Sequence, residues 1–230
     1  MRSFFSYKCK IINSLIYYSP TWLITFRHEL NHKENPSVWA HDESFFIHIP
    51  KSGGTSVSNA LSRKESGHFK FSKLKIKFPE VDNKEVYYFI ARNPIERIVS
   101  TYTYIKDLHR KFGTSNIPSI NVSESLNDFI INHLKYINVN EHYFLRPFSE
   151  VIKGIPKHKL YAVNFDGLSE NMSLFYSEVL DRAIDMPHSN KSSSRTDLYI
   201  SKESKDILFD LYSDDFEIFN KVTEHKYVRL

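Results

Sequence analysis

The segment 45–61 constrains the fold of this chain more than any other part of the sequence. It opens with a short apolar run, rich in aromatic and β-branched residues, which is typical of a central strand in a covered sheet. Pro50 should end that strand because it has no amide hydrogen for the ladder. Gly53 and Gly54 follow, and they permit a tight turn and a close approach of backbone to ligand. The pattern predicts a buried strand followed by a glycine turn.

A helix is expected directly after this turn, from about Thr55 to Arg63, with Thr55 or Ser56 as its N-cap. The first amides of a helix have no intrahelical partner, so such a helix start readily binds an anion, most commonly phosphate. Lys51 adds a mobile positive charge beside the turn. The segment therefore predicts a phosphate-binding loop. The alternative interpretation is a Gly-Gly turn that joins a strand to a helix and binds no ligand.

The order of the residues argues against the ATPase and kinase version of this loop. The Walker A pattern G-x-x-x-x-G-K-[ST] has its lysine after the last glycine, whereas Lys51 precedes both glycines. The stretch from Ile49 to Ser56 resembles instead the 5′-phosphosulfate loop, typically I-P-K-[ST]-G-[GS]-T-[ST], of carbohydrate sulfotransferases. These enzymes use 3′-phosphoadenosine 5′-phosphosulfate (PAPS).

That resemblance implies a role for each loop residue. Lys51 would stabilise charge on the departing phosphate oxygen, and Ser52 would hold Lys51 back until the acceptor arrives. The backbone amides would hold the 5′-phosphate. The implied cofactor contacts come from Lys51, Ser52, Gly53, Gly54, Thr55 and Ser56.

A second strand and helix are expected where Val86 to Ala91 reads as a buried strand. Asn93 is a good N-cap, and Pro94 suits the first helical position. Arg92 then stands at the carboxyl end of a strand, which is where open α/β sheets bind ligands. The sequence predicts a second anion-binding position there.

The run from Arg92 to Ser100 matches R-[DN]-P-x-x-R-x-x-S and resembles the 3′-phosphate-binding motif of the same family. The resemblance implies that Arg92 and Ser100 bind the 3′-phosphate, for which a guanidinium is well shaped. Arg97 has two alternatives, a phosphate contact or an ion pair that holds the helix to the sheet. The two motifs occur in the order and at the spacing that the sulfotransferase family shows. Their combination favours the sulfotransferase interpretation over the alternatives.

A general base is also implied, because an alcohol attacks poorly until its proton is accepted. Gly67 should end a turn, and His68 to Phe71 alternate like a short strand that could return over the site. The family often has a histidine in such a segment, which makes His68 the candidate base. Glu65 and His142 are alternatives, and a surface histidine without a catalytic role is the other interpretation.

The late segment from Pro187 to Arg195 is polar and basic, and its composition alone predicts a surface linker. Its position resembles a family loop, often H-x-N-x-S, that closes over the nucleotide. This implies cofactor contacts from Lys191, Ser192 and Arg195. The basic stretch from Lys73 to Lys77 is either a solvated face or a surface that steers an acidic polysaccharide.

The remaining elements are predicted from local signals. Asp107 to Glu124 reads as a loop, and Ser125 begins a helix to about Ile137 through a capping box. A strand at Lys159–Asn164 and a helix to Leu180 resemble the family's strand–helix crossover. A last helix is predicted from Lys202 to Phe219, with its aromatic residues in the core.

Length and composition fit one globular domain. The resemblance implies a sulfotransferase domain at 44–230, preceded by a helical segment at 1–43 that lies outside it. The chain has 230 residues, 41% hydrophobic content and a net charge of +4, which suits an anionic ligand. Its one cysteine, Cys9, excludes an internal disulfide and favours a reducing compartment. Residues 11–26 carry no charge but are interrupted by polar residues. They predict a packed amphipathic helix, with a membrane-surface anchor or a span as alternatives.

Taken together, the sequence predicts a three-layer α/β/α domain with a mainly parallel, P-loop-like sheet. The resemblance implies transfer of a sulfuryl group from PAPS to a carbohydrate hydroxyl, with no metal and no nucleic-acid partner. The alternatives are a P-loop nucleotide kinase and a non-catalytic acidic-glycan-binding protein on a degenerate fold. We expect a cytoplasmic location, with peripheral contact to the inner membrane face or a Golgi membrane as alternatives. The acceptor sugar and the oligomeric state stay open.

Overall fold

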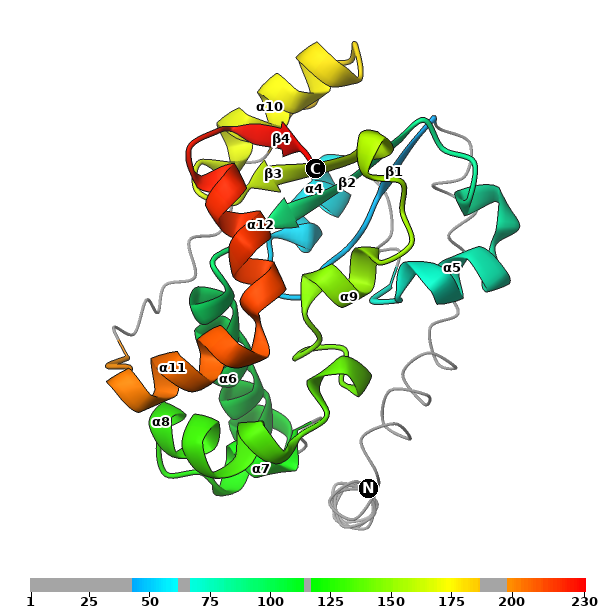
Figure 1. The fold of residues 1–230 in the computed structure, drawn as a ribbon. Helices are drawn as coiled ribbons and strands as arrows, with labels where there is room; N and C mark the ends of the chain where they lie inside the picture. The colour runs from blue at the N-terminus through cyan, green and yellow to red at the C-terminus, as the bar shows by residue number, and fades with distance from the viewer. Residues whose placement is uncertain (1–42, 62–66, 114–116, 187–197) are drawn as a thin grey trace, which may run out of the picture.

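The computed structural model describes residues 43–61, 67–113, 117–186 and 198–230, with elements labelled as in Figure 1. The strands are β1 (Ser44–Phe46), β2 (Val86–Ala91), β3 (Leu160–Asn164) and β4 (Tyr227–Arg229). They form one sheet in the order β1-β2-β3-β4, in which the first three are parallel and β4 is antiparallel to β3. The prediction of an α/β fold with a mainly parallel sheet is confirmed.

The edge position of β1 differs from the sequence prediction. Within the described residues β1 pairs only with β2, whereas its apolar composition favoured a central strand. The ladder continues slightly past the strand, since the Ile47 amide donates to the Tyr88 carbonyl at 2.8 Å. Phe45 and Phe46 are nevertheless buried, because helices cover both faces of the sheet. The apolar run thus predicted the burial of β1 correctly, but its prediction of a central position in the sheet was wrong.

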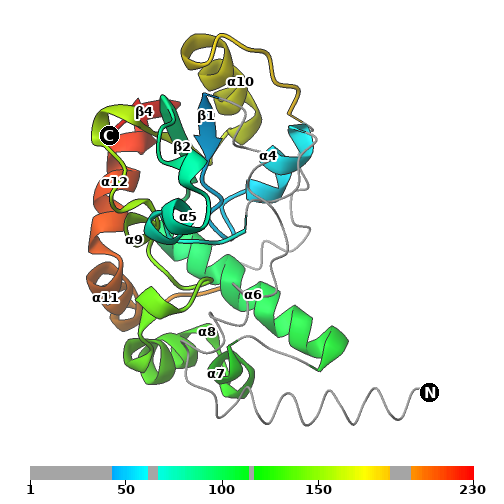
Figure 2. The same ribbon diagram turned by 90° about the vertical axis from the view of Figure 1, so that its right-hand side faces the viewer.

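Helices lie on both faces of the sheet (Figure 2). The helices α4 (Gly54–Ala60) and α10 (Leu168–Val179) lie on one side, and α5 (Phe71–Lys77), α9 (Phe148–Ile152) and α12 (Ser213–Thr223) lie on the other. Successive strand residues point to opposite faces. Tyr88 accordingly packs on Phe175 of α10 at 5.0 Å between ring centres, and Phe89 packs on Phe148 of α9 at 5.6 Å. This arrangement is compatible with the predicted three layers.

A second core lies below the sheet in Figures 1 and 2, around the long helix α6 (Pro94–Phe112). Short helical segments pack beside it, namely α7 (Pro118–Val122), α8 (Leu126–Asp128), a π-helical turn (Phe129–His133), a 3₁₀ turn (Leu134–Tyr136) and α11 (Lys202–Leu211). Three further 3₁₀ turns span Pro79–Val81, Val139–Glu141 and Lys157–Lys159. Among the described residues, the second core is therefore built from helices and loops without any strand, with α6 as its longest helix.

Two predictions of element boundaries were wrong in this region. Asp107–Glu124 is not one loop, because α6 continues to Phe112 and α7 begins at Pro118. The turn residues there end one helix and start another: Gly113 caps α6 at φ 65°, and Pro118 opens α7.

The predicted helix from Lys202 to Phe219 is also two helices, α11 and α12, which meet at Tyr212. The Tyr212 hydroxyl is buried and donates to the Leu145 carbonyl at 2.7 Å, which fixes the bend on the second core. The strand β4 had no local signal, because three residues are too few to show a period of two.

Candidate functional site

The loop between β1 and α4 has an unusual backbone. Lys51 adopts φ 64° and Gly53 adopts φ 79°, so two residues of this short loop occupy the left-handed region. A non-glycine residue in this region is uncommon, and such residues are concentrated at functional sites. Gly53 is the N-cap of α4, without a side-chain cap, so the prediction of Thr55 or Ser56 as N-cap was wrong.

The amide of Ser56 is already used within this loop. It donates to the Gly53 carbonyl at 3.0 Å, and the Ser52 amide donates to the Ile49 carbonyl at 3.3 Å. Thr55 is exposed and Ser56 is half-buried on the first turn of α4. The Ser56 amide thus has a partner within the helix and is not available to the 5′-phosphate. The amides of Gly53, Gly54 and Thr55 remain as the candidates that the resemblance implies.

Both glycines are required by packing. A Cβ on Gly54 would lie 2.0 Å from Cδ2 of His48, and a Cβ on Gly53 would lie 2.7 Å from Cδ2 of Leu168. The loop is thus pressed between the end of β1 and the start of α10. Close packing explains the two glycines without a ligand, and it also holds the loop in one conformation.

Lys51 projects from this loop toward α6. Its Nζ lies 4.1 Å from the centre of the Tyr104 ring, within the range of a cation–π contact. Burial lowers the pKa of Lys51, and the nearby Arg92 guanidinium lowers it further. Two neighbouring cations give this part of the surface a positive potential, which attracts anions.

Arg92 follows β2 and joins the two sequence motifs. Its Nη1 donates to the Lys51 carbonyl at 3.0 Å, although the two residues are 41 positions apart. Its guanidinium also lies 4.4 Å from the centre of the Phe165 ring, and its Nε lies 3.5 Å from a carboxylate oxygen of Glu96. The prediction of Asn93 as N-cap is confirmed, since its Oδ1 accepts from the Ile95 amide at 2.9 Å.

The other residues of the second motif lie further along α6. Ser100 is half-buried, eight residues beyond Arg92. Arg97 is fully buried, and its Nη2 lies 3.6 Å from a carboxylate oxygen of Asp215 on α12. Of the two alternatives for Arg97, the structure shows the ion pair, although it holds α6 to α12 rather than to the sheet.

His68 lies beside the loop, but not on a strand. Residues 67–70 are irregular and α5 begins at Phe71, so the predicted strand was wrong. Phe71 and Leu74 share one helical face and are buried, and this period of three prevailed over the short alternation. The His68 ring centre lies 4.5 Å from that of His48, and the His48 ring contacts Gly54.

Of the alternative bases, only His142 lies within the described residues. His142 is only 2% exposed, and its ring stacks on Tyr143, which also stacks on His68 at 5.6 Å. Glu65 lies outside the described residues, as do Lys191, Ser192 and Arg195. Half-buried His68 therefore has better access to an acceptor than His142.

Sequence reasoning assigned no role to Tyr104, one of three aromatic residues beside the loop. Tyr104, Tyr143 and Phe144 surround the side of the site between Lys51 and His68: the Tyr104 ring packs on Phe144 at 5.6 Å, and Phe144 lies 6.3 Å from His68. No local pattern could reveal the role of Tyr104, because it lies on α6, remote from residues 45–61 in sequence, and meets Lys51 only through tertiary packing.

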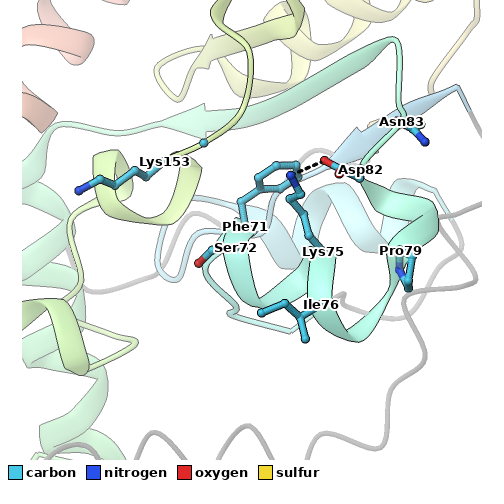
Figure 3. Close-up of a pocket in the computed structure, with 9 residues that line it drawn as sticks. Phe71, Ser72, Lys75, Ile76, Pro79, Asp82, Asn83 and Lys153 are labelled. Atoms are coloured by element: carbon cyan, nitrogen blue, oxygen red, sulfur yellow. Dashed lines mark ion pairs between the residues drawn. The ribbon is translucent and has the colours of Figure 1, made fainter.

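A cavity of about 610 Å³ lies elsewhere on the surface (Figure 3). Its walls come from α5, from the turn before β2 and from the segment after α9, and they consist of Phe71, Ser72, Lys75, Ile76, Pro79, Asp82, Asn83, Lys153 and Gly154. Lys75 pairs there with Asp82 at 2.7 Å. None of the predicted site residues lines it, and Asp82 and Asn83 precede β2 at the amino-terminal end of the strand, away from the ligand-binding edge of α/β sheets.

The described residues show neither a group of metal ligands nor a membrane-spanning helix. Within the described ranges, no three or more His, Cys, Asp or Glu side chains group as a metal site would require. Across the same ranges, no helix combines the length and the apolar character needed to cross a bilayer. Residues 11–26, where a membrane contact was considered, lie outside the described part of the chain.

The geometry thus joins a strained loop, two neighbouring cations and a histidine at the carboxyl ends of β1 and β2. Comparison of the chain with protein-family models, with curated proteins and with solved structures gave no match.

Proposed function

We propose that this protein is a PAPS-dependent carbohydrate sulfotransferase with a P-loop-like fold. The observation that carries the proposal is the hydrogen bond from Arg92 to the Lys51 carbonyl. It brings the stretch that resembles a 5′-phosphosulfate loop into contact with the stretch that resembles a 3′-phosphate motif. A nucleotide with phosphates at both ends of its ribose would need both motifs at one site.

The charges of the site support an anionic nucleotide. Lys51 and Arg92 are half-buried neighbours, so a phosphate between them would relieve their mutual repulsion. The Ser52 hydroxyl is 1% exposed and its Oγ has no hydrogen-bond partner among the described residues. A buried hydroxyl in that condition fits a site completed by a ligand.

In the proposed reaction, Lys51 stabilises the negative charge that develops on the bridging oxygen of PAPS. The acceptor hydroxyl oxygen forms a bond to sulfur as the sulfur–phosphate oxygen bond breaks, and the imidazole of His68 takes the hydroxyl proton. Adenosine 3′,5′-bisphosphate leaves. The His48, Tyr143 and Phe144 rings pack around His68 and would restrict its orientation.

The carbohydrate nature of the acceptor rests on the sequence resemblance alone. The resemblance is also the basis for the proposed cofactor contacts of Lys191, Ser192 and Arg195. The proposed contact of Ser100 with the 3′-phosphate rests on it as well. A cytoplasmic location, with or without peripheral membrane contact, is also part of the proposal and rests on the lone Cys9.

Two rivals remain, a nucleotide kinase and a non-catalytic glycan-binding protein. Calorimetric titration with adenosine 3′,5′-bisphosphate, AMP and ATP–Mg²⁺ separates them. We expect binding that requires the 3′-phosphate and weakens at least tenfold in Arg92→Ala, with Arg110→Ala as control because Arg110 is exposed. Preference for ATP–Mg²⁺ would indicate the kinase, and absence of nucleotide binding would indicate the glycan-binding protein.

Transfer itself requires a second assay. PAPS labelled with ³⁵S would be incubated with a panel of neutral and acidic oligosaccharides, and the products separated by size. We expect label on a carbohydrate with the wild type, and at least a hundredfold less with His68→Asn at unchanged nucleotide affinity. Nucleotide binding without label on any sugar would point to a different acceptor class.

A further inference from the structure

Tyr104 contacts the Lys51 ammonium group, and the sequence analysis assigned it no role. It lies on α6 and is 40% exposed, and Nζ of Lys51 lies 4.1 Å from the centre of its ring. An ammonium group within about 6 Å of a ring face is attracted by the negative charge of that face. The contact thus holds the charged end of Lys51.

The rest of Lys51 is fixed at its backbone. The residue adopts φ 64°, and its carbonyl accepts a hydrogen bond from Arg92 at 3.0 Å. Only the four-carbon stem of the side chain is free to rotate, and the Tyr104 ring restrains the end of that stem. Phe144 packs on the Tyr104 ring at 5.6 Å between ring centres and is itself buried, so the contact limits movement of the Tyr104 ring.

The serine that was expected to restrain Lys51 does not show that contact. The Oγ of Ser52 has no hydrogen-bond partner among the described residues, while the Lys51 ammonium lies on the aromatic ring. The contact uses the face of the ring and not the phenol hydroxyl. Phenylalanine should therefore replace Tyr104 without loss, and an aliphatic residue should not.

We infer that Tyr104 is a positioning residue, which holds the ammonium group of Lys51 beside the loop until a bound anion takes it over. The restraint itself is a property of the protein alone. The identity of the anion, a nucleotide phosphate, rests on the proposed function. The two parts can therefore be tested separately.

The restraint is tested by NMR of protein with ¹³C-labelled lysine, in which Lys51→Met identifies the Lys51 signal. A ring face shifts nearby protons upfield, so the Lys51 Hε signal should lie upfield of the other lysines. Tyr104→Phe should retain that shift and Tyr104→Leu should abolish it. Tyr136→Leu is the control, since Tyr136 is 78% exposed and lies 5.1 Å from a different lysine, Lys135.

A pH titration of the same signals adds a second readout. The cation–π contact favours the charged form, so its loss in Tyr104→Leu should lower the pKa of Lys51 below the wild-type value, while Tyr104→Phe should not. A Lys51 signal without an upfield shift in the wild type, or one that keeps its shift in Tyr104→Leu, overturns the inference.

Adenosine 3′,5′-bisphosphate is then added to the wild type. Movement of the Lys51 signal away from its ring-shifted position supports the transfer of the ammonium to a phosphate. A persistent ring shift with no response to nucleotide would leave the restraint standing and count against the proposed function. A Lys51 signal that responds to the nucleotide but shows no ring shift without it would support the proposed function and overturn the restraint by Tyr104.

Discussion

The imidazole ring of His48 occupies the space that a side chain at Gly54 would need. A Cβ at position 54 would lie 2.0 Å from Cδ2 and 2.1 Å from Nε2 of that ring, far inside van der Waals contact. His48 in turn packs on His68, at 4.5 Å between ring centres. The loop, the end of β1 and the candidate base are therefore in mechanical contact.

Gly54→Ala should accordingly destabilise the protein by about 1–3 kcal/mol, because the added methyl must displace the ring. Urea denaturation measures the change. His48→Ala removes the obstacle, so the double variant His48→Ala/Gly54→Ala should lose less than the sum of the two single losses. Strict additivity would show that the ring and the methyl do not meet.

Asp215→Ala should be much more costly. It removes the carboxylate that pairs with buried Arg97 at 3.6 Å and that accepts the amides of Phe148 and Ser149 at 2.9 Å each. Burial raises the pKa of Asp215, while Arg97 and the two amides oppose that rise. An unpaired buried guanidinium costs about 3–5 kcal/mol, so we expect a loss of that size in urea denaturation.

Asp107→Ala is the matched control for the buried pair. Asp107 pairs with Arg110 at 3.1 Å, but both side chains are exposed, and such pairs contribute about 0–1 kcal/mol. Similar losses in the two variants would contradict the assigned role of Asp215. Recovery of stability in Arg97→Met/Asp215→Leu relative to Asp215→Ala would identify the unpaired charge as the cause.

Arg92→Gln should loosen the loop even without a nucleotide. The variant loses the charged hydrogen bond to the Lys51 carbonyl, which we expect to contribute roughly 1–2 kcal/mol to local stability. Hydrogen exchange followed by mass spectrometry should show faster exchange in residues 49–54 and unchanged exchange in β3. Arg110→Gln should leave both regions as in the wild type, and equal protection of the loop in Arg92→Gln would mean that the bond does not hold it.

Lys51 should give the protein a specific pH dependence. Its pKa is lowered in the folded state from an ordinary value of 10.5, mainly by burial and then by Arg92. Between the folded value and 10.5 the unfolded chain binds more protons, so the contribution of Lys51 to stability rises with pH through that window. Below the window Lys51 is protonated in both states and its burial penalty is constant.

Lys51→Met should remove this rise. The difference in unfolding free energy between the Lys51→Met variant and the wild type, measured by urea denaturation from pH 7 to 10, should shrink or reverse with increasing pH, since the wild type alone gains. Tyr and Lys groups elsewhere titrate in both proteins and cancel in the difference. A pH-independent difference would mean that Lys51 has the same pKa in both states.

Much of the local structure followed from signals within a few residues. The structure confirms the strand predicted at Val86–Ala91 and the helix start predicted from Asn93 with Pro94. It also confirms the cap predicted at Ser125, although the helix expected to reach Ile137 is α-helical only to Asp128 and continues as π-helical and 3₁₀ turns. These signals are reliable because strand burial and helix capping depend on neighbours one to four positions away. The sequence also resembles both phosphate motifs, with Lys51 and Arg92 as their cations.

Only the tertiary structure decided which of these residues meet. The contacts of Lys51 with Arg92 and Tyr104, of His68 with His48, and of Arg97 with Asp215 join positions that are remote in the chain. Such pairs are set by how the helices pack on the sheet, which no short pattern encodes. For the same reason no strand forms at His68–Phe71: residues 67–70 are irregular, and Phe71 begins α5, where its ring is buried against Tyr87 of the sheet.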